Sequence, residues 1–420
     1  MKKLVSLLAL IFCAGVLFGN AQTEAQTGEV EVLHWWTSGG EAASVAVLKE
    51  LLEAEGHTWK DFAVAGGGGD QAMTVLRSRA VAGNPPTAAQ VKGPQIQDWA
   101  EEGFLTNLDD VAAAENWDKL IPKVVADIMK YQGNYVAVPV NVHRINWMWV
   151  NPEVFEKAGA NIPKTWGEFE TAAKKIQAAG LIPVAWGGQP WQEATVFETI
   201  VAGLGGTDFY RKTMVQADPG AIDSPTMVKC LETLKMMKRY TDPGAPGRDW
   251  NLATAMVIKG EAGMQFMGDW AKGEFTAAGK KPDVDYIAVA APGTSKQFLF
   301  NVDSFIMFEV KDKKAKEAQK AMARLILEPK FQEVFNVNKG SIPVITGMSE
   351  GPFDIPARLS MKDFVASANS GDLVPSMAHE MATKRAIRGA IMDTVTSFYN
   401  SDMSAKDAAA QMANSVRSAQ

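Results

Sequence analysis

The stretch EVEVLHWWTSGGEAAS, residues 29–44, indicates the kind of fold that the chain adopts. Its first residues include alternating hydrophobic side chains, a pattern that predicts a β-strand. The strand runs into two adjacent tryptophans, a Ser-Gly-Gly turn and a glutamate that begins a helix. Because successive side chains of a strand point to opposite faces, one of Trp35 and Trp36 fits the core and the other needs a different role.

Strand–helix alternation continues after this stretch. Strands are predicted at 61–65 and 87–91, and each is followed by a helix, at 70–82 and 94–103. Such alternation with short connections favours a mostly parallel sheet covered by helices. A second α/β block follows, with a helix predicted at 165–180 and a strand at 183–187.

Strand-rich segments near 136–143, 288–302 and 339–343 separate these blocks. We expect the chain to cross there between two α/β lobes, each a mostly parallel sheet covered by helices, with hinge strands between them. The predicted lobes are 28–140 plus 300–340, and 141–299 plus 341–420. Ligands of open α/β sheets bind outside the carboxyl ends of strands, which is where the Trp35–Trp36 corner is expected.

Length, composition and charge limit the class of protein. A chain of 420 residues is too long for one ordinary core, and its net charge of -6 gives no reason to expect binding to nucleic acid or an anionic membrane. Residues 1–21 combine Lys2 and Lys3 with a short apolar run and end at Ala21, which predicts a secretory signal peptide. No later segment is apolar for long enough to insert in a membrane. Cys230 lies among helically spaced apolar residues and is expected to be a buried thiol.

Signatures of catalysis and of cofactor binding are mostly missing. The sequence holds no G-x-S-x-G, no H-E-x-x-H and no Cys/His cluster of metal-ligand spacing. AVAGGGGDQAM resembles a dinucleotide loop, but Lys92 stands in the region where the ribose-binding acid belongs, so we expect a loop of close backbone approach. No cofactor and no metal is expected. The enzymatic alternative is a carbohydrate-active hydrolase that uses Glu41 and Asp303 as paired carboxylates.

Three tryptophans next to glycine turns, Trp35, Trp36 and Trp270, suggest a binding platform. An indole face can pack against the C–H face of a sugar, while planar polar side chains bind its hydroxyls, and such a site rejects analogues that lack them. Isolated tryptophans are more often core residues, because they bury so much area. We expect that role for four others: Trp99, Trp117, Trp147 and Trp149.

Five motifs, together with the signal peptide and the two interleaved lobes, point to a known family. In their order along the chain, these motifs resemble the extracellular sugar-binding proteins of bacterial ABC importers. The motifs are VLHWWTSGGE, VPVNVHRINWMWVN, MQFMGDWAKGEF, FLFNVDSF and NKGSIPV. The sequence is most similar to glucose-binding proteins of Gram-negative bacteria, over essentially the whole mature chain. The resemblance implies the two-lobed periplasmic-binding-protein fold, a periplasmic location and no enzymatic activity.

The resemblance also implies a set of ligand-binding residues. Several of them, such as Lys92, Asn301 and Asp303, are polar residues in or next to apolar strands, where a plain core would not place them. On the sequence alone, Lys339 fits a turn cation equally well, and His379 fits a packed surface histidine. The full set is Trp35, Trp36, Glu41, Gly66, Gln90, Lys92, Arg144, Trp270, Asn301, Asp303, Lys339 and His379.

By this resemblance the protein is expected to be a monomeric receptor that closes around a monosaccharide, with glucose as the first candidate. Asp303 and Glu41 would accept hydrogen bonds from the sugar, and Lys92 and Lys339 would donate. The closed form would dock on an ABC-type permease of the inner membrane, which this chain does not contain. The alternatives are another hexose, a disaccharide, or the exported hydrolase.

Overall fold

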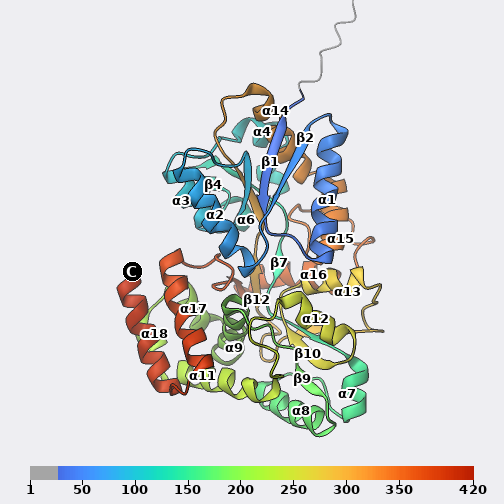
Figure 1. Ribbon diagram of the computed structural model, residues 1–420, viewed down its shortest axis with the longest axis vertical. Helices are drawn as coiled ribbons and strands as arrows, with labels where there is room; N and C mark the ends of the chain where they lie inside the picture. Colours follow the sequence, from blue (N-terminus) through green and yellow to red (C-terminus); the bar gives the residue numbers. More distant parts are fainter. Residues whose placement is uncertain (1–26) are drawn as a thin grey trace, which may run out of the picture.

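The computed structural model describes residues 27–420 and consists of two α/β lobes stacked along the long axis (Figure 1). The predicted signal peptide, residues 1–21, lies outside the described residues. Within 27–420, no helix is long and apolar enough to cross a membrane. The two-lobed α/β architecture expected from the sequence is thus present.

The first lobe is built on a five-stranded sheet in the order β2-β1-β3-β13-β6. β2, β1 and β3 run parallel, whereas β13 runs antiparallel to both β3 and β6. A small hairpin, β4–β5, lies beside this sheet. The strands are β1 Glu29–His34, β2 Thr58–Ala63, β3 Ala88–Val91, β4 Lys130–Tyr131, β5 Asn134–Tyr135, β6 Ala137–Pro139 and β13 Ser304–Met307.

Helices cover the first lobe: α1 packs against α14 and α15, and in Figure 1 α1 and α15 lie to the right of β1 and α14 lies at the top. The helices of this lobe are α1 Gly39–Ala54, α2 Asp70–Val81, α3 Gln95–Glu101, α4 Asp109–Ala114, α5 Trp117–Leu120, α6 Lys123–Ala126, α14 Lys313–Ile326 and α15 Pro329–Lys339.

The second lobe has a four-stranded sheet in the order β11-β8-β10-β9. Its strands are β8 Trp147–Val150, β9 Ile182–Val184, β10 Ala262–Phe266 and β11 Ile287–Ala290. Its helices are α7 Pro152–Ala158, α8 Trp166–Ala178, α9 Pro190–Tyr210, α10 Pro219–Ile222, α11 Pro225–Met237, α12 Trp250–Ile258, α13 Ala271–Ala277, α17 Arg385–Asn400 and α18 Ala405–Ala419.

A third sheet, in the order β14-β12-β7, lies between the lobes (Figure 1). β7, His143–Arg144, leads from the first lobe into β8, and β12, Phe298–Asn301, leads back into β13. β14, Leu373–Pro375, follows the connecting helix α16, Ile355–Ser370. A bridge between Val142 and Ile342 adds a third crossing point. Because the chain passes between the lobes several times, these short strands form the hinge region.

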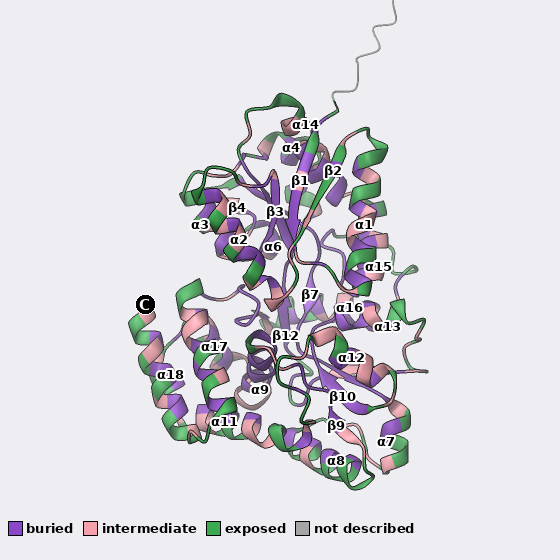
Figure 2. Cartoon of the chain, in the orientation of Figure 1, coloured by how far each residue is buried: buried purple, intermediate pink, exposed green. Residues whose placement is uncertain are grey.

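Each lobe has its own hydrophobic core, and buried residues follow the sheets of both lobes (Figure 2). Trp99 and Trp117 are buried in the first core, and Trp147 and Trp149 in the second, as expected. Cys230 is also buried in the second core, which raises the pKa of its thiol to about 12. The residue boundaries of the lobes given above stay a prediction.

In the sheet of each lobe all strands but one point in the same direction, as expected; the exceptions are β13 in the first lobe and β8 in the second. In the second lobe only β9 and β10 pair in parallel, whereas β8 is antiparallel to both β10 and β11. In the first lobe the exception follows from the crossing chain: β13 enters this lobe from the hinge, so Ser304 pairs with Val91 at the carboxyl end of β3. A strand that starts where β3 ends must run against it. The alternation of strands and helices along the sequence does not show where a strand re-enters a sheet from the hinge.

Local sequence signals set the ends of the helices. α8 begins after Thr165, whose Oγ1 accepts a hydrogen bond from the N–H of Glu168 at 3.2 Å. α7 begins at Pro152, behind the capping side chain of Asn151, and ends at Gly159 with a left-handed backbone. Such caps satisfy backbone groups that a helix end leaves unpaired.

Candidate functional site

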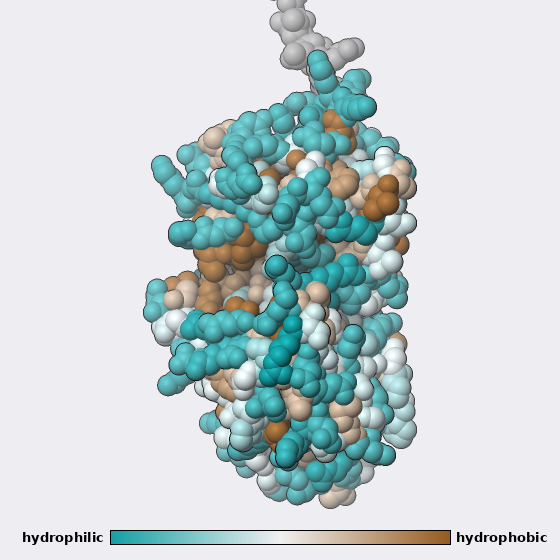
Figure 3. Space-filling model, turned by 90° about the vertical axis from the view of Figure 1, so that its left-hand side faces the viewer, coloured by the Kyte–Doolittle hydropathy of each residue, from teal (hydrophilic) through white to brown (hydrophobic). Residues whose placement is uncertain are grey.

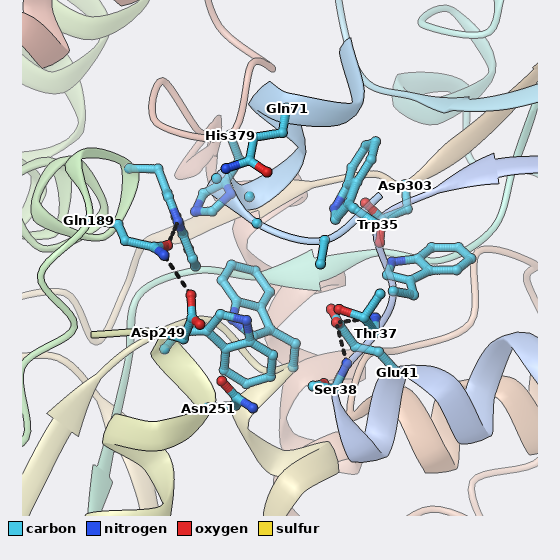
Figure 4. A pocket seen from close by; sticks show the side chains of 18 of the residues that line it. Trp35, Thr37, Ser38, Glu41, Gln71, Gln189, Asp249, Asn251, Asp303 and His379 are labelled. Carbon is cyan, nitrogen blue, oxygen red and sulfur yellow. Dashed lines mark hydrogen bonds between the residues drawn. The ribbon is translucent and has the colours of Figure 1, made fainter. Parts of the chain in front are cut away.

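A cavity of about 410 Å³ lies between the lobes, next to the hinge sheet. From the side, the molecule is hollowed between its upper and lower parts (Figure 3). The first lobe and hinge supply Trp35, Trp36, Thr37, Ser38, Glu41, Ala65, Gly66, Gly67, Gly68, Gln71, Lys92, His143, Asn301, Asp303 and Lys339. The second lobe and the segment after it line the cavity with Gln189, Trp191, Asp249, Trp250, Asn251, Trp270 and His379 (Figure 4).

The two adjacent tryptophans have different environments, as the strand alternation predicts. Trp36 is only 2% exposed, and its ring meets the edges of Phe305 and Phe335 in the first core, although it also reaches the cavity wall. Trp35 is half-buried and lies on the cavity wall, with the Nζ of Lys92 at 4.9 Å from its ring centre. Trp36 is thus mainly a core residue, and Trp35 is the one available to a ligand.

Glu41 lies in the first turn of α1 and is fixed from several sides. Its Oε2 accepts hydrogen bonds from the backbone N–H groups of Thr37 and Ser38, at 3.3 and 3.4 Å. Its Oε1 lies 2.7 Å from the Nζ of Lys339, at the end of α15. A carboxylate is favoured at this end of a helix, because the first turn leaves N–H groups unpaired. The buried ion pair therefore joins two helices on the wall of the cavity.

His143, on the hinge strand β7, connects carboxylates from both lobes. Its Nε2 lies 2.9 Å from the Oδ2 of Asp303, and its Nδ1 contacts Asp269. Burial alone would lower the pKa of His143, but the charges of Asp269 and Asp303 outweigh it and raise this pKa. Burial would likewise raise the pKa of Asp303, yet His143, Lys339 and Lys92 hold it well below its usual range. Each partner therefore favours the ionised form of the other.

The Gly66–Gly69 loop is a point of close approach. All four glycines have positive φ, between 61° and 109°, a backbone region that glycine adopts without strain. A Cβ on Gly68 would lie 3.1 Å from the ring of Trp191, across the cavity, and a Cβ on Gly69 would lie 3.1 Å from the ring of Trp35. The sequence suggested a loop of close backbone approach, and the loop fits closely between two indoles.

The second lobe presents an aromatic cluster around Trp270. The ring centre of Trp270 lies 4.9 Å from that of His379, and Trp191 and Trp250 lie 6.3 and 6.5 Å from it. Burial and the charges of Lys92 and Arg388 lower the pKa of His379 well below its usual value, so its ring is neutral. These rings form an apolar wall opposite the charged residues of the first lobe.

Next to the aromatic cluster around Trp270, polar side chains extend the same wall of the cavity toward its outer part. The Nε1–H of Trp191 donates to the Oε1 of Gln189 at 2.7 Å, and the Nε2 of Gln189 donates to Asp249 at 2.5 Å. Figure 4 shows Gln189, Asp249 and Asn251 on the side of the cavity opposite Trp35 and Glu41. A ligand in the cavity would therefore meet polar groups from both lobes.

Two of the predicted site residues do not line the cavity. Gln90 is fully buried behind it, where its Oε1 accepts a hydrogen bond from the N–H of Trp35 at 3.3 Å. Arg144 points away, into an ion pair with Asp363 at 2.7 Å, and stacks over Trp147. Because His143 and Arg144 are neighbours on a strand, they face opposite sides. The arginine is a structural residue, and the adjacent histidine is the one that reaches the cavity.

The other ten predicted residues line the cavity, and twelve that were not predicted join them. His143 stood inside a quoted motif as a polar residue in an apolar strand, so the sequence did carry a signal for it. Trp191 looks like an ordinary first-turn residue of a helix, and Gln189, Asp249 and Asn251 carry no local signal. Gly67 and Gly68 belong to the glycine loop for which the sequence predicted close backbone approach. The twelve are Thr37, Ser38, Ala65, Gly67, Gly68, Gln71, His143, Gln189, Trp191, Asp249, Trp250 and Asn251.

The charges of the cavity suit binding better than hydrolysis. A glycosidase needs one carboxylic acid that holds its proton near neutral pH. Asp303 is instead held in its ionised form by His143, and Glu41 is tied to Lys339. In the described chain, 27–420, no group of three or more His, Cys, Asp or Glu residues could hold a metal ion.

Two α/β lobes joined by hinge strands, with an aromatic and charged cavity between them, define a solute-binding receptor. The chain belongs to the bacterial extracellular solute-binding proteins: the family with this description matches residues 36–332. Members of this family are receptors and not enzymes, which excludes the hydrolase alternative.

Curated relatives match the chain over all or part of its length. A "Probable sugar-binding periplasmic protein" of Brucella melitensis is 46% identical over 422 residues, covering 100% of both chains. A protein of the same description from Rhizobium meliloti is 47% identical over 95% of this chain and 96% of its own. The "Glucose-binding protein GlcS" of Saccharolobus solfataricus is more distant, at 26% identity over 56% of this chain and 45% of its own.

Solved structures share the fold. A "Chitin oligosaccharide binding protein" superposes with a TM-score of 0.79 at 18% identity, over 94% of this chain and 99% of its own. At this level of identity the similarity shows the two-lobed architecture alone.

Proposed function

We propose that this protein is a periplasmic sugar receptor that binds a monosaccharide, glucose in the first place, between its lobes and delivers it to an ABC-type permease. The printed descriptions of the relatives from Brucella and Rhizobium support a periplasmic sugar-binding role. The signal peptide expected at residues 1–21 supports export. The receptor acts as a monomer, and its permease is a separate protein.

One observation carries the sugar assignment: the cavity places indole faces opposite paired, buried charges. Glu41 is neutralised by Lys339 and Asp303 by His143, so these residues offer charge-assisted hydrogen bonds without demanding a charged ligand. A neutral molecule with many hydroxyls and an apolar C–H face satisfies both walls. Hydroxyls are suitable partners because each can donate and accept.

Unused hydrogen-bonding capacity in the cavity supports the same assignment. In the described structure, the Oδ1 of Asn301 and the Oγ of Ser38 are buried and have no hydrogen-bond partner. Both residues line the cavity. A buried polar atom without a partner costs free energy, and a ligand hydroxyl at each position would remove that cost.

In the proposed complex the ring of Trp35 and the Trp270 cluster enclose the sugar. Lys92 and Lys339 donate to its hydroxyls, and Asp303, Glu41 and Asn301 accept. Ligand binding closes the lobes about the short strands of the hinge, because contacts to both lobes exist only in the closed form.

A disaccharide is the second candidate ligand. The cavity continues past the residues named above to Gln189, Asp249 and Asn251, which lie on its outer part. These side chains could hydrogen-bond a second sugar ring. GlcS, the distant glucose-binding relative, supports the single hexose instead.

A calorimetric titration against glucose, galactose, mannose, maltose, cellobiose and glucuronate tests the proposal. The expected result is tightest binding of glucose and no measurable binding of the anionic glucuronate. Tighter binding of maltose or cellobiose than of glucose would favour the disaccharide. A protein that binds none of these sugars would contradict the proposed function.

A further inference from the structure

Glu380 has an unusual backbone conformation beside the cavity. Its φ is 65°, in the left-handed region, although it is not a glycine, and its side chain is buried. Residues in this region are rare and are retained where surrounding structure enforces them. Glu380 does not itself line the cavity, so a direct contact with the ligand does not explain the strain.

The segment that carries Glu380 is anchored in the second lobe. Glu198 of α9 accepts hydrogen bonds from the Oγ of Ser376 at 2.5 Å and from the N–H groups of Met377 and Ala378 at 2.8 and 3.3 Å. The next residue, His379, lines the cavity. The position of Glu380 is therefore fixed to the second lobe.

The carboxylate of Glu380 lies between two cations that belong to different lobes. Its Oε2 faces the Nζ of Lys92, at the end of β3 in the first lobe, at 3.9 Å. Its Oε1 lies 3.4 Å from the Nη1 of Arg388 on α17. Arg388 in turn reaches across to Asp70, at the start of α2 in the first lobe, at 3.1 Å. A chain of alternating charges thus links the lobes beside the cavity.

The backbones of the two lobes also meet here. A Cβ on Gly93, the residue after Lys92, would lie 2.1 Å from the backbone oxygen of Glu380. Only glycine permits this approach. The side chain of Lys92 is 4% exposed, and its other polar contact is the carbonyl oxygen of Gly68 at 3.4 Å. In the described structure, Glu380 is the one carboxylate within 4 Å of this buried ammonium.

We infer that Glu380 is a positioning residue of the binding site: it is delivered by the second lobe as the counter-ion that holds the Lys92 ammonium at the cavity. The inference rests on the proposed function for the role of Lys92 toward the sugar, but not for the contact itself. A buried charge that loses its partner either moves toward solvent or destabilises the folded protein by a large free energy. Lys92 is therefore in place for a ligand when the lobes are together, and less so when they separate.

The first test needs no sugar. Full-length mature protein is treated briefly with acetic anhydride, and acetylation of Lys92 is followed by mass spectrometry. In Glu380→Gln we expect acetylation of Lys92 about fivefold faster or more than in wild type, because the ammonium is no longer held. Glu101→Gln, at an exposed position on α3, should leave the rate unchanged. An unchanged rate in Glu380→Gln would overturn the inference, whatever the protein binds.

The second test is a double-mutant cycle on glucose affinity with Glu380→Gln, Lys92→Gln and the double variant. We expect Glu380→Gln to weaken binding on the order of tenfold in the wild-type background and hardly at all beside Lys92→Gln. An equal loss in both backgrounds would show that Glu380 does not act through Lys92. Faster acetylation without any glucose binding by wild type would instead contradict the proposed function and leave the contact standing.

A further variant separates positioning from folding. Glu380→Gly removes the carboxylate and suits the positive φ, so it should be at least as stable as Glu380→Gln, which loses the same charge but keeps the backbone strain. It should still show the faster acetylation of Lys92. If Glu380→Gly acetylates Lys92 at the wild-type rate, the effect of Glu380→Gln would be a folding defect, and the inference would be wrong.

Discussion

The Nε2 of His143 lies 2.9 Å from the Oδ2 of Asp303, and this contact joins the hinge strand β7 to the wall of the cavity. Asp269, on the other side of the imidazole, comes from the second lobe. The hinge and the cavity thus share one buried charge network, so the residues that bind a ligand are fixed by the strands about which the lobes move.

This network predicts a pH dependence of stability. The raised pKa of His143 makes its contribution complete below the ordinary value of 6.5 and removes it as the pH rises through the raised value. The lowered pKa of Asp303 makes its contribution complete above the ordinary value of 3.8 and removes it as the pH falls through the lowered value. The two are complete together between these ordinary values.

Urea unfolding of wild type and His143→Gln from pH 4 to 9 would measure this effect. The difference in the free energy of unfolding between the two proteins should be largest between the two ordinary values and should decrease as the pH rises further. A difference that is constant or grows toward pH 9 would show that His143 is not a protonated partner of the carboxylates.

The two tryptophans of the opening strand should differ in their contributions to folding. Trp36→Ala empties a core position and should cost about 3–5 kcal/mol of unfolding free energy. Trp35→Ala should cost distinctly less, because its ring is half-buried on the cavity wall. Urea denaturation of both variants measures this, and equal losses would contradict the different environments assigned to the two rings.

Gly68, in the Gly66–Gly69 loop, can be compared with Gly83, a glycine outside the loop. Gly68 and Gly83 both have positive φ, at 61° and 73°, so alanine should cost a similar ~1–2 kcal/mol at each. Only at Gly68 would the new Cβ meet a neighbour, the ring of Trp191, while nothing lies within 4 Å at Gly83.

Melting temperature and glucose affinity of Gly68→Ala and Gly83→Ala test this difference. Both melting temperatures should fall by similar amounts, and only Gly68→Ala should bind glucose more weakly. If Gly83→Ala loses as much affinity, the loop contact with Trp191 has no part in binding.

Arg144 should behave as a structural residue. Arg144→Met removes its ion pair with Asp363 and should cost about 1–3 kcal/mol of unfolding free energy. The folded fraction should bind glucose as tightly as wild type, because the guanidinium points away from the cavity. A loss of glucose affinity with no loss of unfolding free energy would show that Arg144 is a ligand-binding residue after all.

The sequence predicted the two-lobed fold because hydrophobic periodicity and short connections are local signals. It also predicted residues such as Trp35, Glu41 and Asp303, which stand as polar or aromatic residues at the ends of apolar elements. Arg144 was predicted as a site residue, but its neighbour His143 lines the cavity instead. The pattern of a short strand does not say which of two polar neighbours faces the cavity. Gln90 was predicted beside Lys92 but lies behind Trp35.

The second-lobe wall could not be predicted for a different reason. Gln189, Asp249 and Asn251 lie at the starts of α9 and α12, and they meet because these two helix starts come together, where Gln189 donates a hydrogen bond to Asp249. The direction of β13 could not be predicted either, because the sequence does not show from which side a crossing strand enters a sheet. Long-range contacts decide both.

A calorimetric titration of glucose into wild type, Trp35→Ala and Asp303→Asn tests the binding site most directly. We expect that wild type binds glucose, that both variants still unfold cooperatively, and that each binds glucose about tenfold more weakly or worse, since each loses an anchor worth at least ~1–2 kcal/mol. Binding by both variants with the wild-type affinity would contradict the account and would place the sugar site elsewhere.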